Sequence, residues 1–130
     1  MEIERQIFLV DDNASIRKAM RRFLSSAGVD VQIFASAEEF LDFISPRVSG
    51  CLILDVRLPG LSGLELQERL TQMESHLRII FITAFSDAKL RERALASGAV
   101  AFLEKPVDHQ QLLQTIMSIW NGDKVDSDLG

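Results

Sequence analysis

Short apolar runs alternate along the chain with longer stretches in which apolar residues recur every three or four positions. The runs are strand-sized and rich in Val, Ile, Leu or Phe, which is typical of β-strands. Because a polar residue interrupts only one of them, at Gln32, the strands are expected to be covered on both faces, as in a parallel sheet. The predicted strands are residues 7–10, 31–34, 51–54, 79–82 and 101–103.

The stretches between these runs predict helices. Gly28 and Gly98 each follow a periodic segment, in the position where glycine commonly ends a helix. Ser36 with Glu39 resembles a capping box, and Asp108 is placed to cap the last helix. The predicted helices are residues 16–27, 36–44, 64–73, 87–97 and 108–120.

This alternation of strands and helices, with short links between them, predicts an α/β fold of the doubly wound type. We expect a five-stranded parallel sheet with the flavodoxin-like strand order 2-1-3-4-5, and five helices that cover both of its faces. A length of 130 residues fits one domain of this kind, large enough to bury a core.

Composition narrows the classes of function. The formal net charge of −5 makes the chain a poor candidate for binding DNA or an anionic membrane by itself. The single cysteine, Cys51, lies in an apolar run and is expected to be a core residue, so no internal disulfide can form. No segment has the pattern of a signal peptide or a membrane span, which predicts a cytoplasmic protein. The polar residues 121–130 are expected to be a tail or the start of a linker.

Three carboxylates follow two of the predicted strands. Asp11 and Asp12 come after the first strand and Asp55 after the third. With the strand order 2-1-3-4-5 these two strands are neighbours at the point where the order reverses, which is where open α/β sheets bind ligands. Asp residues at strand ends are also common as separate, solvated turn or cap residues, and that interpretation is the alternative here.

A cluster of this kind would need a cation or protons. Two carboxylates about 5 Å apart repel by about 3 kcal/mol at an effective dielectric constant of about 20. Oxygen ligands favour Mg²⁺ over zinc, and neither His76 nor His109 lies near these strand ends in the sequence. Thr83 follows the fourth strand and Lys105 the fifth, so the same edge of the sheet is expected to carry a hydroxyl and an ammonium group. A lysine in that position can neutralise a phosphoryl oxygen, although most lysines after strands are surface charges.

These motifs together resemble the receiver domain of two-component response regulators. Each motif is weak alone, but all occur in order and each ends a predicted strand. The resemblance covers residues 6 to about 120, so the predicted receiver domain is residues 1–120. The matching segments are VDDN at 10–13, LDVRLPGLSG at 54–63, TAF at 83–85 and KP at 105–106.

The resemblance implies a role for each residue of the site. Asp55 is expected to accept a phosphoryl group as a covalent nucleophile, with Lys105 neutralising the transferred group. Thr83 and Phe102 are expected to form a switch that responds to it. Mg²⁺ is the expected cofactor. Its expected ligands are Asp11, Asp12, Asp55 and the backbone carbonyl of Arg57.

Two further expectations follow from the resemblance. The peptide bond before Pro106 is expected to be cis, which is plausible because such bonds lose most of the trans preference. Family members vary at the positions of Arg57 and Phe85, which are placed to control how water reaches the phosphoryl group.

The implied function is signalling rather than turnover of an external substrate. A histidine kinase or a phosphotransfer protein would supply the phosphoryl group, and the domain would catalyse only its own phosphorylation and dephosphorylation. Phosphorylation would favour a homodimer and would control transcription through a C-terminal effector, with DNA contacted only by that domain. The stretch 94–113 looks closest to receivers that precede a LuxR-type helix-turn-helix. A single-domain regulator that acts by protein–protein contact is the alternative.

Other classes fit the residues less well. A dehalogenase-type phosphatase needs a second aspartate two positions after its nucleophile, where this chain has Arg57. A flavodoxin-like FMN binder needs a hydroxyl-rich loop after the first strand, where this chain has Asp11 and Asp12. An interaction module whose acidic residues no longer act remains a third possibility.

Overall fold

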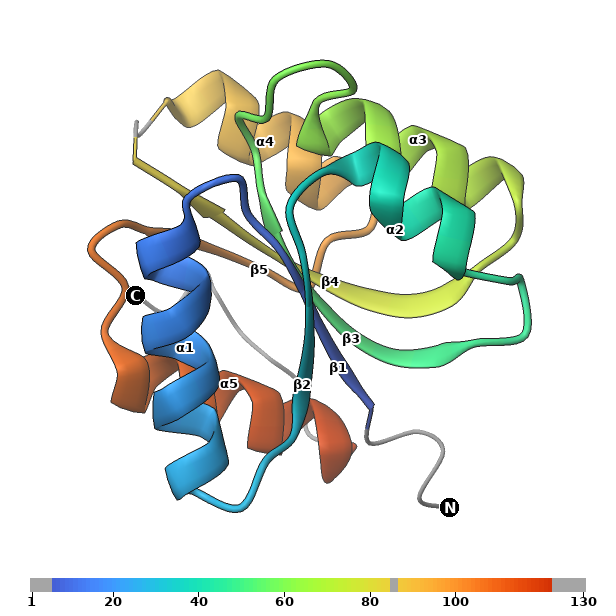
Figure 1. Ribbon diagram of the computed structural model, residues 1–130. Coiled ribbons are helices and arrows are strands. Elements are labelled where there is room, and N and C mark those ends of the chain that lie inside the picture. The colour runs from blue at the N-terminus through green and yellow to red at the C-terminus, as the bar shows by residue number, and fades with distance from the viewer. Residues whose placement is uncertain (1–5, 85–86, 123–130) are drawn as a thin grey trace.

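The computed structural model describes residues 6–84 and 87–122, and this part of the chain forms a five-stranded parallel sheet with helices on both faces (Figure 1). The strand order is β2-β1-β3-β4-β5, which confirms the predicted flavodoxin-like fold. The strands are β1 (Ile7–Val10), β2 (Val31–Phe34), β3 (Ser49–Asp55), β4 (His76–Thr83) and β5 (Ala101–Glu104). The helices are α1 (Ala14–Ser26), α2 (Ala37–Phe43), α3 (Gly63–Gln72), α4 (Ala88–Ala96) and α5 (His109–Trp120).

Two hydrophobic clusters lie on opposite faces of the sheet, because successive strand residues point to opposite sides. Phe8 and Val10 of β1 belong to the cluster under α2, α3 and α4, and Ile7 and Leu9 to the cluster under α1 and α5. The central strands are therefore apolar throughout, as their sequence predicts. Cys51 lies in the second cluster, and burial raises the pKa of its thiol to about 12.

Three strands are longer than the apolar runs that predict them: β3 and β4 extend at both ends, and β5 extends to Glu104. β3 begins at Ser49, which pairs with His76 of β4, and it ends at Asp55, which pairs with Ile82. Backbone pairing does not depend on apolar side chains, so the strands continue through polar residues that the pattern cannot detect. Within residues 6–84 and 87–122, none of the helices combines the length and the hydropathy that a membrane-spanning helix requires.

The helices begin at polar caps. Ser36 caps α2 through the amide of Glu39, but the Glu39 carboxylate binds the amide of Ala35 instead of that of Ser36. The complete, reciprocal capping box lies at α3, between Ser62 and Glu65. Both are ways of satisfying amides that the first turn of a helix leaves without partners.

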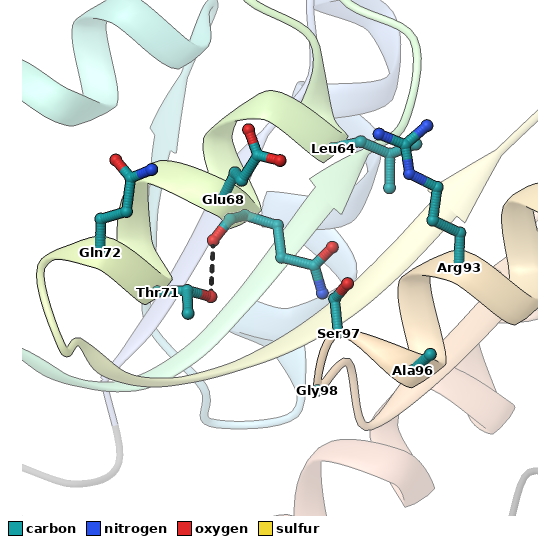
Figure 2. A pocket seen from close by; sticks show the side chains of 9 residues that line it. Leu64, Glu68, Thr71, Gln72, Arg93, Ala96, Ser97 and Gly98 are labelled. Carbon is teal, nitrogen blue, oxygen red and sulfur yellow. Dashed lines mark hydrogen bonds between the residues drawn. The ribbon is translucent and has the colours of Figure 1, made fainter.

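A groove of about 520 Å³ runs between α3 and α4 (Figure 2). At its base the buried amide of Gln67 donates a hydrogen bond to the carbonyl of Ala94, with 3.0 Å between nitrogen and oxygen. Ala94 is also the one buried residue of α4, all of which lies in the described chain. The C-terminal half of α4 therefore contacts α3 through this hydrogen bond, and it buries few apolar residues. The groove is lined by Leu64, Gln67, Glu68, Thr71, Gln72, Arg93, Ala96, Ser97 and Gly98.

Candidate functional site

Three carboxylates meet at the carboxyl ends of β1 and β3. These strands are neighbours in the sheet, so Asp11 and Asp12 lie beside Asp55. One carboxylate oxygen from each residue can be chosen so that all lie within 4.8 Å of one another. Asp11 and Asp55 are buried and Asp12 is exposed. The cluster predicted from the strand ends is therefore present, with one member open to solvent.

Asp11 is held by the backbone and side chains around it. The amide of Asn13 donates to its Oδ1 at 2.9 Å, and Arg17 Nη1 of α1 donates to its carbonyl oxygen at 2.7 Å. The amide of Asp11 donates to the carbonyl of Phe34 at the end of β2. These bonds fix the turn between β1 and α1, and with it the direction of the buried carboxylate.

Asp55 is fixed in a comparable way. The amide of Arg57 donates to its Oδ1 at 3.1 Å, and the next residue, Val56, is bound through its amide to the carbonyl of Ile82. α3 begins directly against this backbone, because a side chain at Gly63 would overlap the main-chain oxygen of Asp55. Glycine is therefore required there by close approach and not by its backbone angles.

Lys105 joins the two buried carboxylates. Its Nζ lies 2.9 Å from Asp11 Oδ2 and 3.0 Å from Asp55 Oδ2. The contact with Asp55 has hydrogen-bond geometry, whereas the contact with Asp11 is an ion pair without a directed hydrogen bond. The amide of Lys105 donates to the carbonyl of Thr83 at 2.7 Å, and the peptide bond that links Lys105 to Pro106 is cis.

The charges of the site shift the pKa values of two members. Burial raises the pKa of Asp55, and the Asp11 carboxylate raises it further, while Lys105 opposes both effects in part. Burial lowers the pKa of Lys105, but its contacts with Asp11 and Asp55 outweigh burial and raise it above its usual value. The ammonium group therefore stays charged at neutral pH, as a partner for negative charge at this edge of the sheet.

The donor set fits a hard divalent cation such as Mg²⁺. Two buried carboxylates and one exposed carboxylate offer only oxygen, and a single ammonium group does not balance three carboxylates. The exposure of Asp12 leaves room for water among the ligands, which Mg²⁺ usually retains. Neither histidine belongs to the cluster.

The remaining residues predicted for the site lie around this centre. Thr83 is fully buried at the end of β4. Phe102 is half-buried on β5, with its ring centroid 6.2 Å from that of Phe81. Arg57 is exposed and lies two residues after Asp55, the buried end of β3, and Phe85 lies outside the described residues. The structure thus brings Thr83 to the same sheet edge as the carboxylates and places Phe102 one strand further out.

Two contacts at the site were missed from the sequence. Arg17 binds the carbonyl of Asp11, and Glu38 of α2 binds the amide of Leu61 in the loop after Asp55. An arginine side chain in the first turns of the helix that follows Asp11 and Asp12 is the sequence signal that could have indicated the first contact. Nothing local indicates the second, because Glu38 and Leu61 are 23 residues apart.

The chain is similar to proteins of known type. A family model described as the response regulator receiver domain matches residues 7–117. Nodulation protein W of Bradyrhizobium diazoefficiens is 42% identical over 118 residues, which cover 91% of this chain and 52% of that protein. The transcriptional regulatory protein TdiR of Thauera aromatica is 42% identical over 110 residues, which cover 85% of this chain and 48% of that protein. The solved structure of the response regulator StyR has a TM-score of 0.82 at 44% identity, covering 88% of this chain and 58% of that one.

Proposed function

The chain belongs to the response regulator receiver domain family, and from this premise we propose that Asp55 accepts a phosphoryl group from a histidine kinase or a phosphotransfer protein. The observation that supports Asp55 most directly is its position. The Asp55 carboxylate lies at the end of β3, where it forms an ion pair with Lys105 and lies beside the Asp11 carboxylate. The same edge carries Thr83, so acceptor, cation and hydroxyl donor are close together.

The proposed reaction is an in-line transfer. A carboxylate oxygen of Asp55 forms the new bond to phosphorus, and the bond between phosphorus and the donor breaks, with the bonding electrons leaving on the donor atom. Lys105 is placed to exchange its contact with Asp55 for one with a phosphoryl oxygen. Bound Mg²⁺ would be held by Asp11, Asp12, Asp55 and the Arg57 carbonyl, and it would neutralise the charge that approaches the three carboxylates.

We also propose that the phosphorylated domain acts on a C-terminal effector. The chain spans about half the length of the curated relatives it matches, 52% of nodulation protein W and 48% of TdiR. TdiR is named as a transcriptional regulator, which supports control of transcription as the output. In that arrangement DNA is contacted only by the effector. A single-domain regulator that acts through protein contacts is the second candidate, and the full-length sequence decides between them.

Phosphorylation is tested by intact mass after incubation with acetyl phosphate. We expect one phosphoryl group per chain when Mg²⁺ is present, none when a chelator replaces it, and none in Asp55→Asn. Asp42→Asn is the matched control, because Asp42 is an exposed aspartate of α2 outside the cluster. Incorporation of phosphate by Asp55→Asn to the level of the control would refute the assignment.

A further inference from the structure

We propose that Glu38 is a positioning residue for phosphoryl transfer: from α2, its carboxylate holds the tip of the loop that carries the Arg57 carbonyl. The inference rests on the proposed function, since that carbonyl matters only if the site binds a divalent cation. Glu38 itself touches neither the carboxylate cluster nor the acceptor. It acts through the backbone of residues 57–62.

Hydrogen bonds of backbone amides fix the loop at both of its ends. At its base, the amide of Gly63 donates to the carbonyl of Val56 at 3.0 Å, so residues 57–62 form a closed loop directly after the acceptor strand. At its start, the amide of Arg57 binds Asp55 Oδ1. Between these points the loop turns through Gly60, whose φ of +75° is the left-handed conformation that favours glycine.

Glu38 binds the loop at this turn. The amide of Leu61 donates to Glu38 Oε2 at 2.9 Å, and this hydrogen bond holds the pKa of Glu38 below its usual range. A side chain at Gly60 would lie 2.6 Å from the same oxygen, so the carboxylate occupies the space that glycine leaves. The next amide along the chain, that of Ser62, is bound by Glu65.

The two carboxylates hold the loop differently. Glu65 lies three residues from Ser62 and belongs to the capping box of α3, so its bond orders only the start of that helix. Glu38 comes from α2, a different helix, and is 23 residues away from Leu61 in the sequence. It ties the loop to α2, which packs on the same hydrophobic cluster as Leu58. The backbone between the acceptor and α3 is therefore placed by α2 as well as by its own ends.

Loss of this bond is expected to weaken cation binding more than it weakens the fold. Partners that orient a metal ligand from outside the coordination sphere commonly change affinity by 10-fold or more. We expect Glu38→Ala to raise the Mg²⁺ concentration for half-maximal phosphorylation by acetyl phosphate about 10-fold. Glu38→Gln keeps an oxygen acceptor for the Leu61 amide and is expected to restore most of the wild-type value.

The matched control is Glu39→Ala. Glu39 is the neighbouring acid of the same helix turn, and it binds the amide of Ala35 without touching the loop. Its loss removes the same charge and weakens the start of α2, so its melting temperature should fall while its Mg²⁺ dependence stays that of wild type. A second measurement needs no activity: without metal, the Leu61 amide should exchange its hydrogen faster in Glu38→Ala and not in Glu39→Ala.

The outcomes are distinguishable. Absence of Mg²⁺-dependent labelling in the wild type would refute the proposed function itself. Labelling of the wild type with the same Mg²⁺ dependence in Glu38→Ala would overturn the positioning role alone. Two other results would also overturn the positioning role. One is an equal loss of Mg²⁺ affinity in Glu38→Ala and Glu39→Ala, and the other is failure of Glu38→Gln to restore the wild-type value. In either case the loss would not come from the broken hydrogen bond to Leu61.

Discussion

Lys105 lies between two buried carboxylates and is the residue on which the charge balance of the site depends. Its Nζ is within 3.0 Å of both Asp11 Oδ2 and Asp55 Oδ2, and only 15% of its side chain is exposed. Removing one partner of a buried ion pair leaves an uncompensated charge, which costs more than the pair itself contributes. The site in the absence of metal is therefore stable because of this lysine, and a bound cation would take over part of the same task.

We predict that Lys105→Met lowers the free energy of unfolding by about 3 kcal/mol in the presence of a chelator. Asp55→Asn in the same chain should recover part of that loss, because it removes one of the two carboxylates that the lysine neutralises. Urea unfolding of the two single variants and the double variant measures this coupling. Additive effects of the two substitutions would contradict the charge-balance account.

The same lysine gives a pH dependence with a defined sign. The pKa of Lys105 is raised in the folded state above its unfolded value of about 10.4, because its contacts with two carboxylates outweigh burial. Its stabilising contribution is therefore complete below about pH 10.4 and is lost as the pH rises through the folded-state pKa. The wild-type melting temperature should fall in that alkaline range more steeply than that of Lys105→Met.

These residues could be predicted from the sequence because topology brings them together. Once strands one and three are neighbours, Asp11 and Asp55 must meet at one edge, and Lys105 arrives at the same edge after β5. Glu38 could not be predicted, because its bond joins two segments whose approach depends on the angle of α2. Periodicity reports which face of a helix is buried, and it carries no information on which loop the exposed face reaches.

Among the helices, α4 buries the smallest share of its residues. Ala94 is the one buried residue among the nine of this helix, all of them within the described chain, whereas α3 buries four of ten. The sequence of α4 contains few apolar residues, and it therefore predicts this low burial. It does not predict Gln67, a polar residue on the buried face of α3 that binds the carbonyl of Ala94. Buried side-chain amides are almost always hydrogen-bonded in folded proteins. The bond from Gln67 to the Ala94 carbonyl therefore marks the point at which α4 is held against α3.

We predict that Gln67→Ala lowers the free energy of unfolding by about 2 kcal/mol, through the lost hydrogen bond and the space left by the side chain. Amide hydrogens of the last turn of α4 should also exchange faster. Gln72→Ala is the control, because Gln72 lines the same groove from the exposed end of α3 (Figure 2). Equal exchange rates in the last turn of α4 in both variants would show that Gln67 does not attach this helix.

At the scale of the whole molecule, the strands around Asp55 are deeply buried, whereas α4 and β5 bury few of their residues. β1, β3 and β4 form the centre of the sheet and are buried throughout near Asp55, while α4 and β5 lie beyond them towards one edge. Thr83 is fully buried at the end of β4, and Phe102 is half-buried on β5. Elements that move in regulation are drawn from the least stable parts of a structure. A change at Asp55 is therefore expected to be expressed at α4, β5 and α5 before it disturbs the rest of the sheet.

We predict that beryllofluoride, a phosphoryl mimic, shifts the population of the α4–β5–α5 surface towards a form that associates with a second copy of the chain. Thr83 should turn towards the added negative charge, and Phe102 should rotate into the space beside β5, because a hydroxyl donates to an anion and an aromatic ring gains by burial. Light scattering at several protein concentrations should show a larger mass with Mg²⁺ and beryllofluoride than without them, and no increase in Asp55→Asn. Backbone amide shifts should spread over residues 87–120. Shifts confined to the surroundings of Asp55, with no change in mass, would mean that the site and this surface are not coupled.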